Sequence, residues 1–406
     1  MIEWSEQHEA IRDAFRRFVE AEITPRLADF EHGDTPPYDV LRKMVRTFGI
    51  DEMQRQRFTS QLAREKAAAS GGPPRKREQR STEDIALQLI PIIELCRHCP
   101  GMVTALGVSV GLTPAAIIAR GTIAQKERWV LPLLTLDKIG AWAITEPGSG
   151  SDAFGGMKAT ARRDGDDYVL NGNKTFITNG PYADTIVFIC KLDDGSAVRE
   201  RKVLSFVLDA GMPGLTQSRP MRKMGLHSSP TGELFLEDVR VGRDRLLGES
   251  EDVPARAGAK DTFSLERTGV AAMALGIVEE CLARSLDYAR TRVQFGRPIG
   301  EFQLIQLKLA RMAVARMNLR NIVFRQIEMA ASGRSMSLAE ASACKLYAAQ
   351  AAVDVALEAV QVFGGNGYMA EFHVEQLCRD AKVLQIYAGT DEIQVSQIAR
   401  SLLKDG

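Results

Sequence analysis

Two short segments carry the residue types that could hold a ligand. The run from Ala143 to Asp152, AITEPGSGSD, follows an apolar stretch and is rich in small residues and hydroxyls. Such a loop exposes backbone N–H groups and lets a ligand come close. Downstream, Phe176 supplies an aromatic face and Thr178 a hydroxyl. A planar ring could stack on the first and hydrogen-bond to the second. The residues alone equally allow a strand end packed in its own core.

Three regions with different sequence patterns must position these segments. Residues 1–135 form a predicted helical domain, in which Ser5 can cap a helix running toward Thr24 and Ser81 can start the next long one. Residues 136–250 form a predicted β domain, with a turn at Asn171-Gly172. No helical pattern intervenes there, so we expect an antiparallel barrel or sandwich.

Residues 251–406 complete an α+β fold as a predicted C-terminal four-helix bundle. Ser337 starts a capping box, and glycine and proline residues separate the helices. The four long periodic segments are 262–292, 302–332, 337–363 and 372–403.

Composition limits the function classes. The chain has 406 residues, too many for one compact core, and its 52 basic residues balance 52 acidic ones. A net charge of zero argues against a general nucleic-acid binder. Six scattered cysteines and no secretory pattern favour a reduced, cytoplasmic protein.

Two stretches need an alternative reading. The motif Cys96-Arg97-His98-Cys99 resembles half of a zinc site, but no second pair follows, so we expect ordinary helix residues and no metal. The uncharged segment 101–119 is long enough for a membrane span. Its glycines, proline and hydroxyls favour a buried helix pair instead, so no span is expected.

Several longer segments, taken together, resemble the acyl-CoA dehydrogenase family over most of the chain. The loop 143–152 is similar to the first motif of that family, and QVFGGNGY at 361–368 is similar to the second. RVQFGRPIGEFQ at 292–303 looks like its flavin-diphosphate segment. RDAK at 379–382, followed by IYAGTDEI at 386–393, resembles its C-terminal segment. The resemblance implies the helical, β, helical order, bound FAD and a homotetramer built as a dimer of dimers.

The resemblance also implies a cofactor site, position by position. Trp142, Ile144 and Thr145 would lie along the isoalloxazine ring, where Phe176 replaces the usual tryptophan and Thr178 reaches its N5 side. The remaining residues implied to contact FAD, some across a subunit interface, are Arg292, Phe295, Gln303, Gln361, Gly364, Gly365, Thr390 and Glu392. Those implied to contact the acyl-CoA substrate are Ser151, Ser264, Arg267 and Gly389.

The catalytic base is predicted on a different element from the commonest family pattern. The family reaction removes an α-proton with a carboxylate while a hydride passes from the β-carbon to flavin N5, giving the 2-enoyl-CoA. Many members place the base in Tyr-Glu-Gly-Thr, but this chain has Ala388 in the acidic position. In an isovaleryl-CoA and long-chain branch the base precedes an arginine on an earlier helix, as Glu266 does here. The Ala388 backbone N–H is then expected to donate to the thioester oxygen.

Two alternatives stay open. Loss of the base would leave a catalytically silent FAD-binding subunit of a mixed oligomer, and a relative using oxygen directly would be an oxidase or monooxygenase. The expected partner is otherwise an electron-transfer flavoprotein or a similar acceptor. Chain length and branching of the acyl group stay open, because residues 54–58 and the basic loop 75–77 depart from the family pattern. His227 stands where an arginine is common and is predicted to be a hydrogen-bonding residue.

Overall fold

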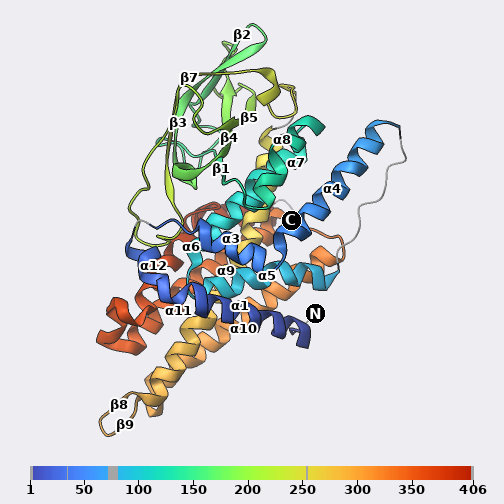
Figure 1. The fold of residues 1–406 in the computed structure, drawn as a ribbon. Coiled ribbons are helices and arrows are strands. Elements are labelled where there is room, and N and C mark those ends of the chain that lie inside the picture. The colour runs from blue at the N-terminus through green and yellow to red at the C-terminus, as the bar shows by residue number, and fades with distance from the viewer. Residues whose placement is uncertain (1–2, 34, 72–80, 253–254, 404–406) are drawn as a thin grey trace.

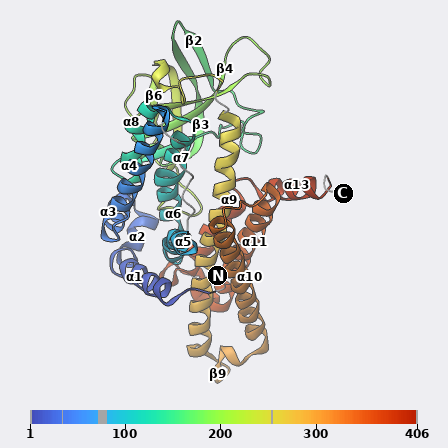
Figure 2. The same cartoon turned by 90° about the vertical axis from the view of Figure 1, so that its right-hand side faces the viewer.

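A computed structural model describes residues 3–33, 35–71, 81–252 and 255–403, without the side chains of 255–266 and 268. A β domain lies at one end of a helical body, and the long helix α9 runs from that domain toward the opposite end (Figures 1 and 2). This arrangement agrees with the predicted helical, β and helical order. The basic loop predicted at 75–77 lies outside the described residues.

The N-terminal region is helical up to residue 134. Ser5 and Ser81 accept hydrogen bonds from the backbone N–H of His8 and Asp84, so the predicted cap at Ser5 and the predicted capping box at Ser81 are confirmed. The helices are α1 (Glu6–Glu22), η1 (Thr24–Arg26), α2 (Leu27–His32), α3 (Tyr38–Thr47), α4 (Ile50–Ala69), α5 (Thr82–Cys96), α6 (Pro100–Leu106), the π-helix η2 (Gly107–Leu112), α7 (Thr113–Arg120) and α8 (Ile123–Leu134).

Residues 100–120 form one continuous helical run, because the π-helix joins α6 to α7, so the predicted helix pair is wrong. Gly107 keeps right-handed helical angles and does not break the run. By length and hydropathy this run and residues 338–368 could each cross a bilayer. About half of each is buried within the described fold, as in core helices of soluble proteins, so this is weak evidence for a membrane.

The β domain is a curled, mostly antiparallel sheet. Its order is β1-β4-β2-β3-β7-β6, with β5 paired to β4, and β4 is parallel to β1 and β2. The strands are β1 (Gly140–Ala143), β2 (Thr160–Asp164), β3 (Asp167–Thr178), β4 (Thr185–Leu192), β5 (Val203–Asp209), β6 (Leu215–Gln217) and β7 (Thr231–Val241), with 3₁₀ turns η3 (Gly180–Tyr182) and η4 (Arg243–Arg245).

The turn predicted at Asn171-Gly172 is a bulge inside β3 instead. The β3–β7 register shifts between Leu170 and Gly172, and the Asn171 amide bonds to Asp238 across the two strands. Gly172 packs so tightly that a Cβ there would lie 2.6 Å from the Cβ of Ala159. The turn that joins β2 to β3 uses Gly165, at φ +66°, which the dipeptide rule overlooked.

The C-terminal bundle packs into one apolar core with the N-terminal helices, including α1, α3 and α5. Ser337 caps α11 as predicted. The elements are α9 (Ala255–Thr291), β8 (Val293–Gln294), β9 (Arg297–Pro298), η5 (Ile299–Glu301), α10 (Gln303–Ala331), α11 (Leu338–Phe363), η6 (Gly364–Tyr368), η7 (Ala370–Phe372), α12 (Val374–Lys382), η8 (Val383–Gln385) and α13 (Asp391–Leu402).

The segment predicted as one helix over 372–403 is two helices. The helical conformation is interrupted between α12 and α13, where Ala388 and Gly389 have φ of +53° and +90°. Thr390 then caps α13 by accepting a hydrogen bond from the Ile393 N–H. The break leaves the Ala388 loop outside any helix, at a point where backbone groups are free to meet a ligand.

Candidate active site

Residues 387–390 form a loop whose carbonyl groups are held by buried side chains. Gln394 Nε2 donates to the Ala388 oxygen at 3.1 Å and to the Gly389 oxygen at 2.7 Å. Lys345 Nζ donates to the Gly389 oxygen at 2.9 Å and contacts Asp391 at 3.3 Å. Both side chains are fully buried, so the loop is fixed from beneath.

Helix α9 meets this loop through Arg267. The Arg267 side chain is buried, and its Nε lies 3.4 Å from the Ala388 oxygen. Glu266 and Ser264 belong to the same helix, but their side chains lie outside the described residues. The backbone of residue 266 directly precedes Arg267 in α9, so its Cα lies about 3.8 Å from that of Arg267.

A second group of predicted residues lies in the β domain. Trp142 and Ile144 are buried at the end of β1, whereas Thr145 and Thr178 are partly exposed. The Phe176 side chain is 67% exposed and its φ is +57°, at a register shift between β3 and β7. The strand therefore holds an aromatic ring outside the core, which rules against the packed strand end that the sequence left open.

A buried ion pair supports the loop that follows β1. Lys174 Nζ lies 2.8 Å from Glu146 Oε1 and 3.1 Å from the Ile144 oxygen. Glu146 also accepts from the backbone N–H groups of Lys158 and Ala159. Burial lowers the pKa of Lys174, and Glu146 opposes that shift. Sequence reasoning missed both residues, although a lysine inside the apolar β3 pattern was a usable signal.

Most of the remaining loop is exposed, although Ser149 is buried. Glu146 and Ser149 pair through their backbones, and the Ser149 hydroxyl donates to the Asp152 oxygen. Ser151, predicted near the substrate, is exposed at the tip. The loop thus presents a hydroxyl and small residues outward from a folded base.

A third group lies at the far end of the bundle. The β8–β9 hairpin is at the end of the molecule opposite the β domain (Figures 1 and 2). It carries exposed Arg292 and Phe295, the latter 94% exposed, and Gln303 follows it. The exposed residues Gln361, Gly364 and Gly365 lie near this end. There Asn366 bonds to the Tyr288 hydroxyl in the last turns of α9.

One chain therefore does not bring all the predicted cofactor residues together. Trp142 and Phe176 belong to the β domain, whereas Phe295 belongs to the opposite end. Thr390 and the exposed Glu392 lie with the Ala388 loop at the start of α13. Sequence reasoning also missed Lys345 and Gln394, although a single lysine within the alanine-rich α11 was a visible signal.

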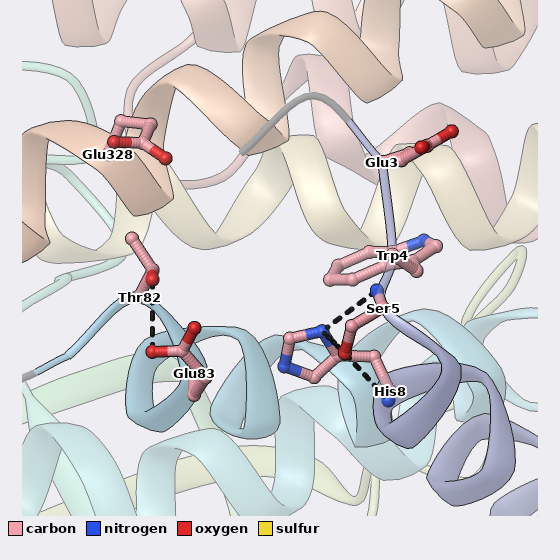
Figure 3. A pocket seen from close by; sticks show the side chains of 7 residues that line it. All are labelled: Glu3, Trp4, Ser5, His8, Thr82, Glu83 and Glu328. Carbon is pink, nitrogen blue, oxygen red and sulfur yellow. Dashed lines mark hydrogen bonds between the residues drawn. The ribbon is translucent and has the colours of Figure 1, made fainter.

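Two other polar features lie apart from these groups. A pocket of about 430 Å³ between α1, α5 and α10 is lined by Trp4, His8 and other residues, and contains none of the predicted site residues (Figure 3). Cys96 and Cys99 are free and buried, and Cys99 lies 3.1 Å from the Ser228 hydroxyl. Among the described residues no three acidic, histidine or cysteine side chains gather as a metal site.

A buried polar junction joins all three regions. Glu31 of α2 faces Arg379 and His227, with Oε2 at 3.6 Å and 3.7 Å from their nearest nitrogens. Asp380 accepts from the Leu226 N–H at 2.5 Å. Nδ1 of His227 lies 2.5 Å from the backbone carbonyl oxygen of Glu31, and its Nε2 lies 2.7 Å from the backbone carbonyl oxygen of Lys223. These contacts confirm the hydrogen-bonding role of His227.

The chain belongs to the acyl-CoA dehydrogenase family. Models of the N-terminal, middle and C-terminal domains of acyl-CoA dehydrogenase match residues 5–54, 141–239 and 257–403. Among curated relatives, the 3-(aryl)acrylate reductase of Clostridium sporogenes (strain ATCC 15579) is 34% identical over 403 residues, with 99% of this chain and 100% of the relative covered.

Solved structures agree with this assignment. The butyryl-CoA dehydrogenase of Megasphaera elsdenii superposes with a TM-score of 0.82 and 32% identity, over 99% of this chain and 100% of that one. A glutaryl-CoA dehydrogenase from Mycobacterium smegmatis, solved in complex with FADH2, has a TM-score of 0.83 and 26% identity, over 98% and 95% of the two chains.

Proposed function

We propose that this chain is an FAD-dependent acyl-CoA dehydrogenase that converts an acyl-CoA thioester to its 2-enoyl-CoA, with Glu266 as the base. The observation that carries the proposal is the contact between Arg267 and the Ala388 oxygen. It brings the helix of the predicted base to the loop where a methyl group stands in the place of an acid.

The described residues fit FAD. Phe176 is exposed on the β domain and Phe295 on the hairpin, and exposed aromatic rings offer stacking surfaces for flat ring systems. Arg292 is an exposed cation beside Phe295, suited to a diphosphate. Since the hairpin lies at the end of the molecule opposite the β domain that carries Phe176, we infer that a second copy supplies the hairpin in a homo-oligomer, as expected for a dimer of dimers.

Bound FAD would supply the acceptor for the hydride from the substrate β-carbon. The chain itself must remove the α-proton and stabilise the charge that develops on the thioester oxygen. Glu266 would take the proton. The amide N–H groups of the Ala388 loop would donate to the oxygen, and Arg267 would hold the loop against α9.

This arrangement favours the isovaleryl-CoA and long-chain branch, in which the base and the small residue are exchanged in the same way. The acyl group itself is open, because the relatives include short-chain and aryl-substrate enzymes. An electron-transfer flavoprotein or a similar acceptor is expected to reoxidise the reduced flavin after each turnover.

The test is anaerobic mixing of purified protein with butyryl-, isovaleryl-, octanoyl- and 3-phenylpropionyl-CoA, while the flavin absorbance is followed. We expect bleaching with at least one thioester, and a rate about 10²–10⁴-fold lower in Glu266→Gln. Asp287→Asn, which neutralises an exposed acid on the same helix, is the control and should match the parent.

The outcomes separate the alternatives. Full activity in Glu266→Gln would refute the assigned base. A flavin-containing protein that no thioester bleaches would favour the silent subunit. Bleaching followed by peroxide release in air, at the rate of turnover, would favour the oxidase.

A further inference from the structure

We infer that Lys345 and Gln394 are positioning residues, which orient the Ala388–Gly389 segment so that its amide N–H groups face the thioester carbonyl of the substrate. This inference rests on the proposed function and extends it to two residues outside the predicted site. Neither side chain touches the substrate in this arrangement, and no bond to either forms or breaks during the reaction.

The geometry of the carbonyl groups carries the inference. The Ala388 and Gly389 oxygens both reach Gln394 Nε2, at 3.1 Å and 2.7 Å, so they point to the same side of the loop. Lys345 Nζ adds a second donor to the Gly389 oxygen at 2.9 Å. Two buried side chains from α11 and α13 thus gather both carbonyls beneath the loop.

Peptide planarity then fixes the opposite face. In a trans peptide the N–H points away from the C=O of the same plane, so holding the Ala388 oxygen beneath the loop turns the Gly389 N–H outward. Among the described residues, neither the Ala388 N–H nor the Gly389 N–H has an acceptor. The loop therefore keeps amide donors for a ligand oxygen.

This network does more than close the chain between two helices. The turn before it is closed by the Ile386 N–H bond to Val383, and α13 is capped by Thr390. Holding Ala388 at positive φ requires added support, because non-glycine residues avoid this region. Burying an ammonium group is also unfavourable. The ion pair of Lys345 with Asp391, at 3.3 Å, offsets part of this cost, and the 2.9 Å contact with the Gly389 carbonyl gives the buried charge a role at the loop.

The variants Lys345→Met and Gln394→Met remove the donors while keeping similar volume. We expect each to lower kcat by about 10–100-fold, with KM changed by less than about threefold, because the donors act on the transition state. Lys345→Arg keeps the cation and should recover part of kcat. Ser342→Ala alters a buried residue three positions earlier on α11 and should leave kcat unchanged.

A spectroscopic measurement separates positioning from folding. In the Glu266→Gln background, where turnover is expected to be about 10²–10⁴-fold slower, the infrared stretch of a carbonyl-¹³C-labelled thioester reports hydrogen bonding to its oxygen. The thioester is the member of the four-compound panel that bleaches the parent fastest. We expect a shift to lower wavenumber on binding, and loss of most of that shift when either methionine variant is added.

The failures are distinguishable. If the parent bleaches with no thioester, the proposed function is wrong and the positioning role with it. If the parent is active but both methionine variants retain kcat and the carbonyl shift, the positioning role alone is refuted. A variant that binds thioester, unfolds at a lower temperature and still shows the full shift also refutes it, since its role is then structural.

Discussion

At the scale of single residues, Gly389 occupies a position that other residues can fill only under strain. Its φ is +90°, and a Cβ there would lie 2.8 Å from Gln394 Nε2. Gly389→Ala should therefore lower the free energy of unfolding by about 1–3 kcal/mol and reduce kcat, because the side chain would push away the donor. Denaturant unfolding and steady-state kinetics measure the two effects.

Gly49→Ala separates strain from displacement. Gly49 also has positive φ, +62°, but a Cβ added there would meet no other atom within 4 Å. It should lose stability through strain alone and keep its kcat. Equal kcat values in the two variants would contradict the effect assigned to the Gln394 contact.

Sequence could locate Ala388 but not its supports. The run IYAGT matches a family motif by its spacing, and the missing acid is visible in the letters, although the break in the helix was not predicted. Lys345 and Gln394 lie 43 and 6 positions away from Ala388 and reach it only through the packing of α11 and α13. Such contacts depend on where helices meet, which local patterns do not specify.

At the scale of elements, the loop after β1 depends on the ion pair between Lys174 and Glu146. Lys174→Met should destabilise the protein by about 3–5 kcal/mol, because it leaves a buried carboxylate without its cation. The double variant Lys174→Met/Glu146→Gln should recover part of this loss. Chemical denaturation of the single and double variants tests the expectation, and a double variant less stable than both singles would contradict it.

The order of elements was predictable, whereas two local breaks were not. Long apolar periodicity identified the helices, a serine cap marked the start of α1, and capping boxes marked the starts of α5 and α11. Asn171-Gly172 was misread because a bulge needs the same residue types as a turn. The break at Ala388 was missed because alanine normally continues a helix, and only the tertiary contacts hold it at positive φ.

At the scale of the whole molecule, Glu31 lies where the three regions meet. Burial, and then the nearby Asp380, raise its pKa to about 8, although Arg379 opposes the shift. Burial also raises the pKa of Asp380 and lowers that of Lys223 to about 8. The junction therefore couples protonation to the packing of the helical and β regions.

Stability should fall as pH rises from about 5 to 8. A carboxyl whose pKa is raised in the folded state binds more protons there than in the unfolded chain. The stabilisation is complete below its ordinary pKa and lost as pH passes through about 8. The lowered pKa of Lys223 acts in the opposite sense, above pH 8. In Glu31→Gln, Tm should fall less between pH 5 and 8 than in the parent protein. The difference should correspond to more than ~1 kcal/mol in the free energy of unfolding.

Thermal unfolding between pH 5 and 8 measures this dependence. Glu20→Gln, which changes an exposed acid on α1, is the control and should keep the parent profile. A parent profile that is flat, or one that declines equally in Glu31→Gln, would contradict the role of the junction.

The hairpin with the exposed Phe295 and the β domain with the exposed Phe176 lie at opposite ends of the folded molecule. If a second copy completes each site, two different inactivating substitutions carried by separate chains do not inactivate every site of a mixed oligomer. Subunits inactivated at Arg292 and subunits inactivated at Thr178 would, after mixing and exchange, form some sites from two intact halves. Two inactive preparations would then become partly active in one tube.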